Sequence, residues 1–201
     1  MPINGGIPQR GNLSLHLTRV EHDVEYLLPD ADFDGYAVID WEVWMPWLVL
    51  ASRSVWVNES IAYVRELHPS WSEPQIEAEA VRTWNVSATL FMVETLKRCV
   101  ALRPKAAWGY YGRPGCYSGL DTAANPPQCT DSVQERNDAL EELWAAGSAL
   151  YPSVYIKTSQ KVCTSTTSPN VTTTTTTTST CPCLQETQLI FVVEAGMCCA
   201  K

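Results

Sequence analysis

Apolar residues recur along this chain at the three-to-four residue spacing of helices over three stretches, 12–28, 55–68 and 72–102. Each stretch ends just before a proline, which cannot continue a helix. Asn12 is a good cap for the first stretch. The third opens with a serine and a glutamine at the spacing of a capping box, with a proline in its first turn. The pattern therefore predicts three amphipathic helices.

Shorter apolar runs predict strands between these helices. Tyr36–Ile39 follows an Asp-Gly turn, 106–111 follows the third helix, and 152–156 comes after a further helix that we expect over 130–148. Helix and strand alternate, as they do in parallel α/β sheets. The predicted fold class is therefore α/β.

The character of the sequence changes after residue 157. Residues 158–180 are rich in Ser and Thr and contain an unbroken threonine run, Thr172–Thr178. Such a segment does not pack a core and is typical of linkers and O-glycosylated stalks. Residues 181–201 form a Cys-rich tail with one apolar run, Leu189–Val193. We expect one domain over 1–157, a linker over 158–180 and a tail of unknown structure over 181–201.

Composition and charge exclude some classes of function. The 201 residues are 45% hydrophobic and 18% charged, which is ordinary for a globular domain. The net charge of −8 argues against nucleic-acid binding, and no apolar stretch is long enough to span a membrane. A polyanionic ligand would need a local basic groove. The candidate cations for such a groove are Arg10, Arg53, Arg103, Lys105 and Arg113.

Eight cysteines and four Asn-X-Ser/Thr sequons indicate an oxidising, secretory route, and so an extracellular or lysosomal protein. We expect glycosylation at Asn12, Asn58, Asn85 and Asn170. Cys99 falls inside a predicted helix, so we expect it to be buried and free. The tail cysteines have no histidine near them, and His16, His22 and His68 are scattered over helices in structural or solvent-facing positions. We therefore predict no metal and no cofactor.

The end of the first strand carries the candidate chemistry. Asp40 and Glu42 lie two residues apart, so on a strand both would project to one side while Ile39 and Trp41 face away. Two acids so placed cannot easily ionise together, and the pKa of one is raised. Sugar hydrolases use such a pair as a proton donor and its helper, whereas the structural alternative is a strand end with a helix N-terminal charge.

Several segments of the chain together resemble the hyaluronidases, a family of glycoside hydrolases. They occur in the family's order and at similar distances over about residues 4–157. The segments are Gly5–Gln9, Leu13–Leu17, Phe33–Trp44, Leu102–Pro104, Trp108–Tyr117 and Ala149–Tyr155. The resemblance implies a barrel similar to the (β/α)₈ fold, here a partial TIM-like barrel, and a glycosaminoglycan substrate, hyaluronan or chondroitin. A chitinase-like enzyme, which also uses an acid pair near a strand end, is a weaker alternative.

The resemblance also implies roles for individual residues. Glu42 matches the family's proton donor, and the substrate's own acetamido oxygen acts as the nucleophile. Asp40 and Tyr111 match the residues that position the acetamido group, while Tyr110 and Trp108 alternate to the core side. Cys116 and Cys129 match a family disulfide, which in the entropic account contributes roughly 3 kcal/mol. The pairing of the remaining cysteines stays open.

Three departures from the family pattern bear on activity. Met45 stands where the family usually has an arginine, and a methionine cannot make a charge-assisted contact with a substrate carboxylate. The family's first barrel strand and its later strands are not found, and no signal peptide is present at Met1, so we expect a truncated product. Two hypotheses follow: a monomeric hydrolase, or an inactive glycosaminoglycan-binding or decoy isoform.

Overall fold

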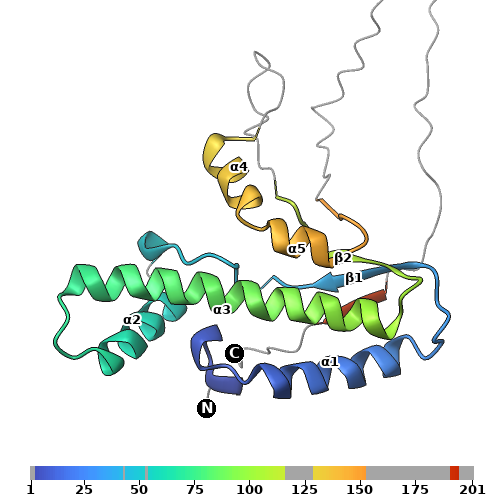
Figure 1. Cartoon of the computed structure of the whole chain (residues 1–201), viewed down its shortest axis with the longest axis horizontal. Helices are drawn as coiled ribbons and strands as arrows, with labels where there is room; N and C mark the ends of the chain where they lie inside the picture. The colour runs from blue at the N-terminus through green and yellow to red at the C-terminus, as the bar shows by residue number, and fades with distance from the viewer. Residues whose placement is uncertain (1–2, 43, 53, 116–128, 153–190, 195–201) are drawn as a thin grey trace, which may run out of the picture.

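The computed structural model describes residues 3–42, 44–52, 54–115, 129–152 and 191–194 (Figure 1). Five helices and three strands make up its regular structure, with short 3₁₀ turns at Ile3–Gly5 (η1), Pro8–Arg10 (η2) and Leu50–Ser52 (η3). The helices are α1 Leu13–Leu27, α2 Val55–Leu67, α3 Glu73–Leu102, α4 Asp131–Asp138 and α5 Glu141–Ala146. The strands are β1 Tyr36–Asp40, β2 Ala107–Tyr110 and β3 Phe191–Glu194.

The long helix α3 is the support on which α1, α2 and α5 pack. Helix α1 lies along it, α2 contacts its N-terminal half, and α5 also packs against it (Figure 1). The predicted starts of α1 and α3 are confirmed: the Asn12 side chain accepts from the Leu15 N–H, and Ser72 with Gln75 forms a capping box. In the part of the chain that is described, no helix combines the length and apolarity needed to cross a membrane.

The three strands form one parallel sheet in the order β2-β1-β3. The register of β1 and β2 pairs Tyr36 with Ala107 and Ile39 with Tyr110. The predicted parallel α/β arrangement is therefore confirmed for β1 and β2. Strand β3 comes from the apolar run of the tail, for which the sequence predicted no structure, and pairs with the other edge of β1.

The core lies between α3 and the sheet and is built largely from large apolar side chains. Trp84, Trp108, Ile39 and Met92 are fully buried there. Arg103 is buried as well: its Nε donates to the Leu28 carbonyl at 2.6 Å. Arg103 was a candidate for a basic groove, and that prediction is wrong because its guanidinium bonds backbone carbonyls inside the core.

The helix predicted over 130–148 is two helices, α4 and α5, interrupted at residues 139–140. The Asn137 carbonyl accepts from the Leu140 N–H at 3.0 Å and from the Trp144 indole N–H at 2.7 Å. Both bonds tighten the chain there, and Leu140 turns into the core. The strand predicted over 152–156 falls mostly outside the described residues, although Tyr151 forms bridges with Tyr111 and Arg113.

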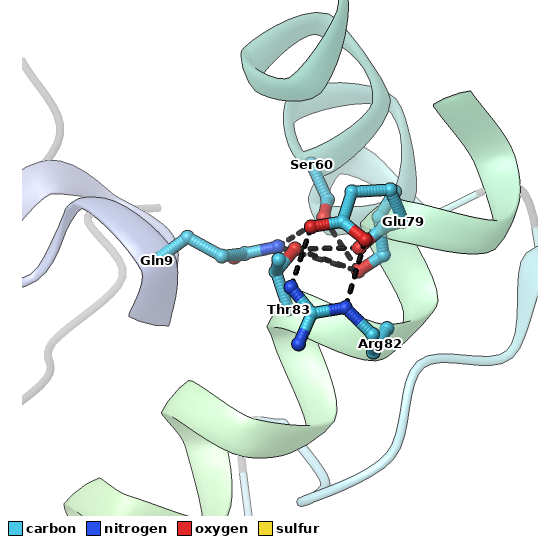
Figure 2. Close-up of polar contacts among 6 residues, drawn as sticks. Gln9, Ser60, Glu79, Arg82 and Thr83 are labelled. Atoms are coloured by element: carbon cyan, nitrogen blue, oxygen red, sulfur yellow. Dashed lines mark hydrogen bonds and ion pairs between the residues drawn. The ribbon is translucent and has the colours of Figure 1, made fainter. Parts of the chain in front are cut away.

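A polar network fixes η2 to α2 and α3 (Figure 2). The Gln9 amide donates to the Ser60 hydroxyl, which in turn donates to the Ala80 carbonyl at 3.4 Å. Beside it, Arg82 and Glu79 form an ion pair at 2.6 Å on α3. The network joins segments far apart in the sequence and holds the N-terminal end of the fold against the helices.

Candidate active site

Asp40, Glu42 and Tyr111 lie at one edge of the sheet because neighbouring parallel strands end there. Asp40 is the last residue of β1, and Tyr111 directly follows β2. The Tyr111 N–H donates to the Ile39 carbonyl at 2.9 Å, which continues the register by one residue and sets Asp40 beside Tyr111. The carboxyl ends of parallel strands are where ligand sites of α/β folds occur.

A pocket of about 270 Å³ opens at this edge. Glu42 and Tyr111 both line it, and Glu42 is exposed. Asp40 is not among the lining residues. The pocket is lined by Trp41, Glu42, Met45, Trp47, Tyr111, Gly112, Arg113, Gly115, Val133, Arg136 and Asn137. Its volume lies just below the roughly 300–1,000 Å³ of typical small-molecule sites, which suits one part of a longer ligand.

Asp40 lies partly buried, beside the exposed Glu42. Its Oδ1 is buried and has no hydrogen-bond partner among the described residues. Burial raises the pKa of Asp40, and the nearby charge of Glu42 raises that pKa further. These surroundings therefore favour the protonated form of Asp40. A protonated Asp40 has a proton to donate to a ligand or to Glu42.

The loop that carries Glu42 is tied to α3. The Trp84 indole N–H donates to the Met45 carbonyl at 3.0 Å, and the Asn85 side-chain oxygen accepts from the Leu48 N–H at 2.9 Å. These two bonds fix the loop after β1 to two adjacent residues of α3. The position of Glu42 is therefore set by α3 as well as by β1.

Buried aromatic rings pack between the same loop and α3. Trp41 meets Trp44 edge-on at 4.7 Å, and Trp44 meets Trp84 at 5.8 Å. Trp41, which we expected to face away from Glu42, is buried but lines the same pocket as Glu42. His16 packs beneath Trp41 at 5.7 Å and bonds Thr95 Oγ1 at 2.7 Å, so its predicted structural role is confirmed. Burial lowers the pKa of His16 to about 4.

The two adjacent tyrosines at the end of β2 behave as alternation predicts. Tyr111 is 36% exposed and reaches the pocket. Tyr110 is buried, and its hydroxyl donates to the Met92 carbonyl at 2.7 Å. Trp108 is fully buried and is also a core residue, as predicted. Only Tyr111 of these three is available to a ligand.

Two arginines line the pocket, of which the sequence indicated one. Arg113 was a candidate cation, whereas Arg136 on α4 was not, because nothing in the local sequence places that face of α4 over the strand ends. Among the other candidates, Arg10 pairs with glutamates of α2, Lys105 pairs with Asp32, and Arg53 lies outside the described residues. Of the five candidate cations for a basic groove, Arg113 is therefore the one that the structure places in the pocket.

The cysteines and sequons have different outcomes. Cys99 is free and fully buried, as predicted, and burial raises the pKa of its thiol to about 12. Cys129 is disulfide-bonded, but Cys116 lies outside the described residues, so their pairing stays a prediction. The side chains of Asn12 and Asn58 are exposed and that of Asn85 is partly buried, while Asn170 is not among the described residues. Glycosylation at these four positions stays a prediction.

Comparison with known proteins gives a consistent result. The profile of the hyaluronidase family matches residues 1–175. Hyaluronidase-1 of Rattus norvegicus is 40% identical over 158 residues, covering 77% of this chain and 35% of its own length. The hyaluronidase of Polistes annularis is 42% identical over 165 residues (79% and 43%), and a chondroitin hydrolase of Caenorhabditis elegans is 41% identical over 162 (80% and 35%).

The fold gives the same answer. Bee venom hyaluronidase, solved in complex with a hyaluronic acid tetramer, superposes with a TM-score of 0.66 at 38% identity. The alignment covers 77% of this chain and 48% of that one. The chain thus spans between about a third and a half of the length of these relatives.

Proposed function

Since this chain belongs to the hyaluronidase family, we propose that its pocket hydrolyses N-acetylhexosaminidic bonds of hyaluronan or chondroitin. The observation that carries the proposal is the meeting of Asp40, Glu42 and Tyr111 at the carboxyl ends of two adjacent parallel strands. One acid is exposed to the pocket and the other is partly buried with an unpartnered oxygen. Such contrasting surroundings separate the roles of two carboxyl groups.

Glu42 is the general acid and base in this proposal. It donates a proton to the oxygen of the breaking glycosidic bond, while the substrate's acetamido oxygen attacks the anomeric carbon from the other side. The products of this step are a free sugar end and a cyclic oxazolinium. The Glu42 carboxylate then takes a proton from water, whose oxygen opens the ring and restores the acetamido group. The net reaction consumes one water, and Glu42 ends protonated as it began.

Asp40 and Tyr111 position the acetamido group. The raised pKa of Asp40 favours a protonated carboxyl, which donates a hydrogen bond or shares its proton with Glu42. The Tyr111 hydroxyl is a second donor at the same edge. Fixed donors in a partly desolvated site are effective because they need little reorganisation during the reaction.

We propose further that residues 1–157 adopt part of a TIM-like (β/α) barrel. The parallel β1–β2 pair, connected through α2 and α3, and the likeness to bee venom hyaluronidase support this assignment. The disulfide at Cys129 supports a secretory route for the protein, because disulfides persist in oxidising compartments.

The test is release of reducing ends from hyaluronan, measured from pH 3.5 to 7.5 on the full chain secreted from a eukaryotic host. We expect Glu42→Gln to lower the rate at least 100-fold, within the range for general acid–base residues. The matched control is Glu141→Gln, an exposed glutamate at the start of α5, which should retain the wild-type rate.

Two outcomes would overturn the proposal. An equal rate of reducing-end release by the wild type and Glu42→Gln would show that Glu42 is not the general acid and base. Folded wild-type protein that binds hyaluronan without cleaving it would instead favour the glycosaminoglycan-binding hypothesis. Running chondroitin in parallel assigns the preferred polymer.

A further inference from the structure

The pocket has a cationic side that the proposed chemistry does not use. The guanidinium of Arg113 lies 5.2 Å from the centre of the Trp47 ring, and that of Arg136 lies 5.6 Å from the same ring. All three residues line the pocket together with Glu42. One aromatic ring therefore holds two arginines beside the candidate proton donor.

We propose that Arg113, Trp47 and Arg136 form a carboxylate clamp, which binds the uronic acid unit adjacent to the N-acetylhexosamine at Glu42. The inference rests on the proposed function, because it takes the ligand to be a glycosaminoglycan. Guanidinium groups bind carboxylates through paired, charge-assisted hydrogen bonds. The clamp would thereby set which sugar of the alternating polymer lies at Glu42.

The three residues come from separate elements, and the fold fixes two of them. Arg113 follows β2, is only 8% exposed, and its guanidinium contacts the Met45 sulfur. Met45 itself cannot bind a carboxylate, as expected from the sequence, but it lies against an arginine from the neighbouring strand end. Trp47 belongs to the loop that α3 anchors through Asn85, so the clamp and Glu42 share one support.

The charge distribution favours an anion at this position. Most arginines and lysines on the described surface already pair with carboxylates of the chain. These are Arg10, Arg19, Arg65, Arg82, Arg98, Lys97 and Lys105. Within the described residues Arg136 makes no such pair. In a protein of net charge −8, a polyanion is attracted only where cations remain available to it.

The pocket is thus acidic on one side and basic on the other. Asp40 and Glu42 lie at the end of β1, and the arginines approach from the segments after β2 and on α4. A polymer that alternates an uncharged acetamido sugar with a uronate matches this polarity. Binding one unit too far along would bring a uronate to Glu42 and leave the two arginines facing an uncharged sugar, so this register is disfavoured.

Binding measured without cleavage tests the clamp. The Glu42→Gln protein is titrated calorimetrically with a hyaluronan hexasaccharide and with its carboxyl methyl ester, at low ionic strength. We expect Arg136→Gln in this background to raise the Kd for the native hexasaccharide about tenfold and to leave the Kd for the ester unchanged. Arg136 is exposed, so its removal should not disturb the fold. Arg113→Gln, at a buried position, is the second variant.

The matched control is Arg65→Gln, on the exposed side of α2, which should alter neither Kd. An equal effect of Arg136→Gln on both ligands, no effect on either, or no hexasaccharide binding at all would overturn the clamp. Failure of the proposed hydrolysis is distinguishable, because it leaves carboxylate-dependent binding intact while the wild type releases no reducing ends.

Discussion

The buried histidine beneath the Glu42 loop makes folding stability depend on pH. His16 is 5% exposed, and burial lowers its pKa from 6.5 to about 4, with the charge of Asp23 opposing the shift. The unfolded chain therefore binds a proton more readily than the folded chain between these two values. Stability from this residue is complete above pH 6.5 and is lost as the pH falls toward 4.

The size of the effect follows from the shift. A difference of about 2.5 pKa units at 1.36 kcal/mol each predicts a loss of about 3 kcal/mol between pH 7 and pH 4. This is a large part of the stability of a typical domain, about 5–15 kcal/mol. His16 should thus be one reason for unfolding in acid.

Urea unfolding of the wild type and His16→Gln at pH 7, 5.5 and 4 measures this contribution. Glutamine keeps an N–H for the bond to Thr95 but does not titrate. We expect His16→Gln to be less stable than the wild type at pH 7 because of imperfect packing, and to lose about 3 kcal/mol less on going to pH 4. The control His22→Gln, at an exposed ring, should follow the wild type. Parallel pH profiles for wild type and His16→Gln would refute the reasoning.

Three further substitutions test the packing and the site. Gly109→Ala should destabilise the fold by about 3 kcal/mol in urea unfolding, because the added Cβ would clash with the Ala149 carbonyl oxygen. A variant as stable as the wild type would contradict this close contact between Gly109 and Ala149. Arg103→Met should lower the free energy of unfolding by roughly 2–4 kcal/mol, since it leaves the buried Leu28 carbonyl without its charged donor. An unchanged free energy of unfolding would show that this buried hydrogen bond does not stabilise the fold. Tyr111→Phe should lower kcat for hyaluronan roughly 100-fold with unchanged unfolding, whereas an unaltered kcat would assign the hydroxyl no part in the reaction.

The sequence predicted the elements well where local signals agree with the packing. Asn12, the Ser72–Gln75 capping box and the helix-ending prolines determine α1 and α3 through backbone bonds within a few residues. Strand β1 was predictable because a continuous apolar run suits a strand buried on both faces. The interruption between α4 and α5 was not, because it depends on the Trp144 indole bonding the Asn137 carbonyl, a contact set by packing.

The site likewise contains residues that the sequence predicted and features that it did not. Asp40, Glu42 and Tyr111 lie at or just after the ends of strands, so strand periodicity and the family resemblance together indicated them as site residues. The raised pKa of Asp40 depends on how deeply each carboxyl is buried, which residue spacing does not determine. Arg136 and Trp47 were missed because they reach the pocket from a helix and a loop far from each other in the chain.

The central claim is that these three residues support hydrolysis in which the substrate's acetamido group is the nucleophile. The configuration of the new reducing end at the moment of its release tests this most directly, by proton NMR of early time points before mutarotation. Two displacements at the anomeric carbon predict that the first product keeps the configuration of the bond that was broken. A first product of inverted configuration would contradict the account, because it requires direct attack by water.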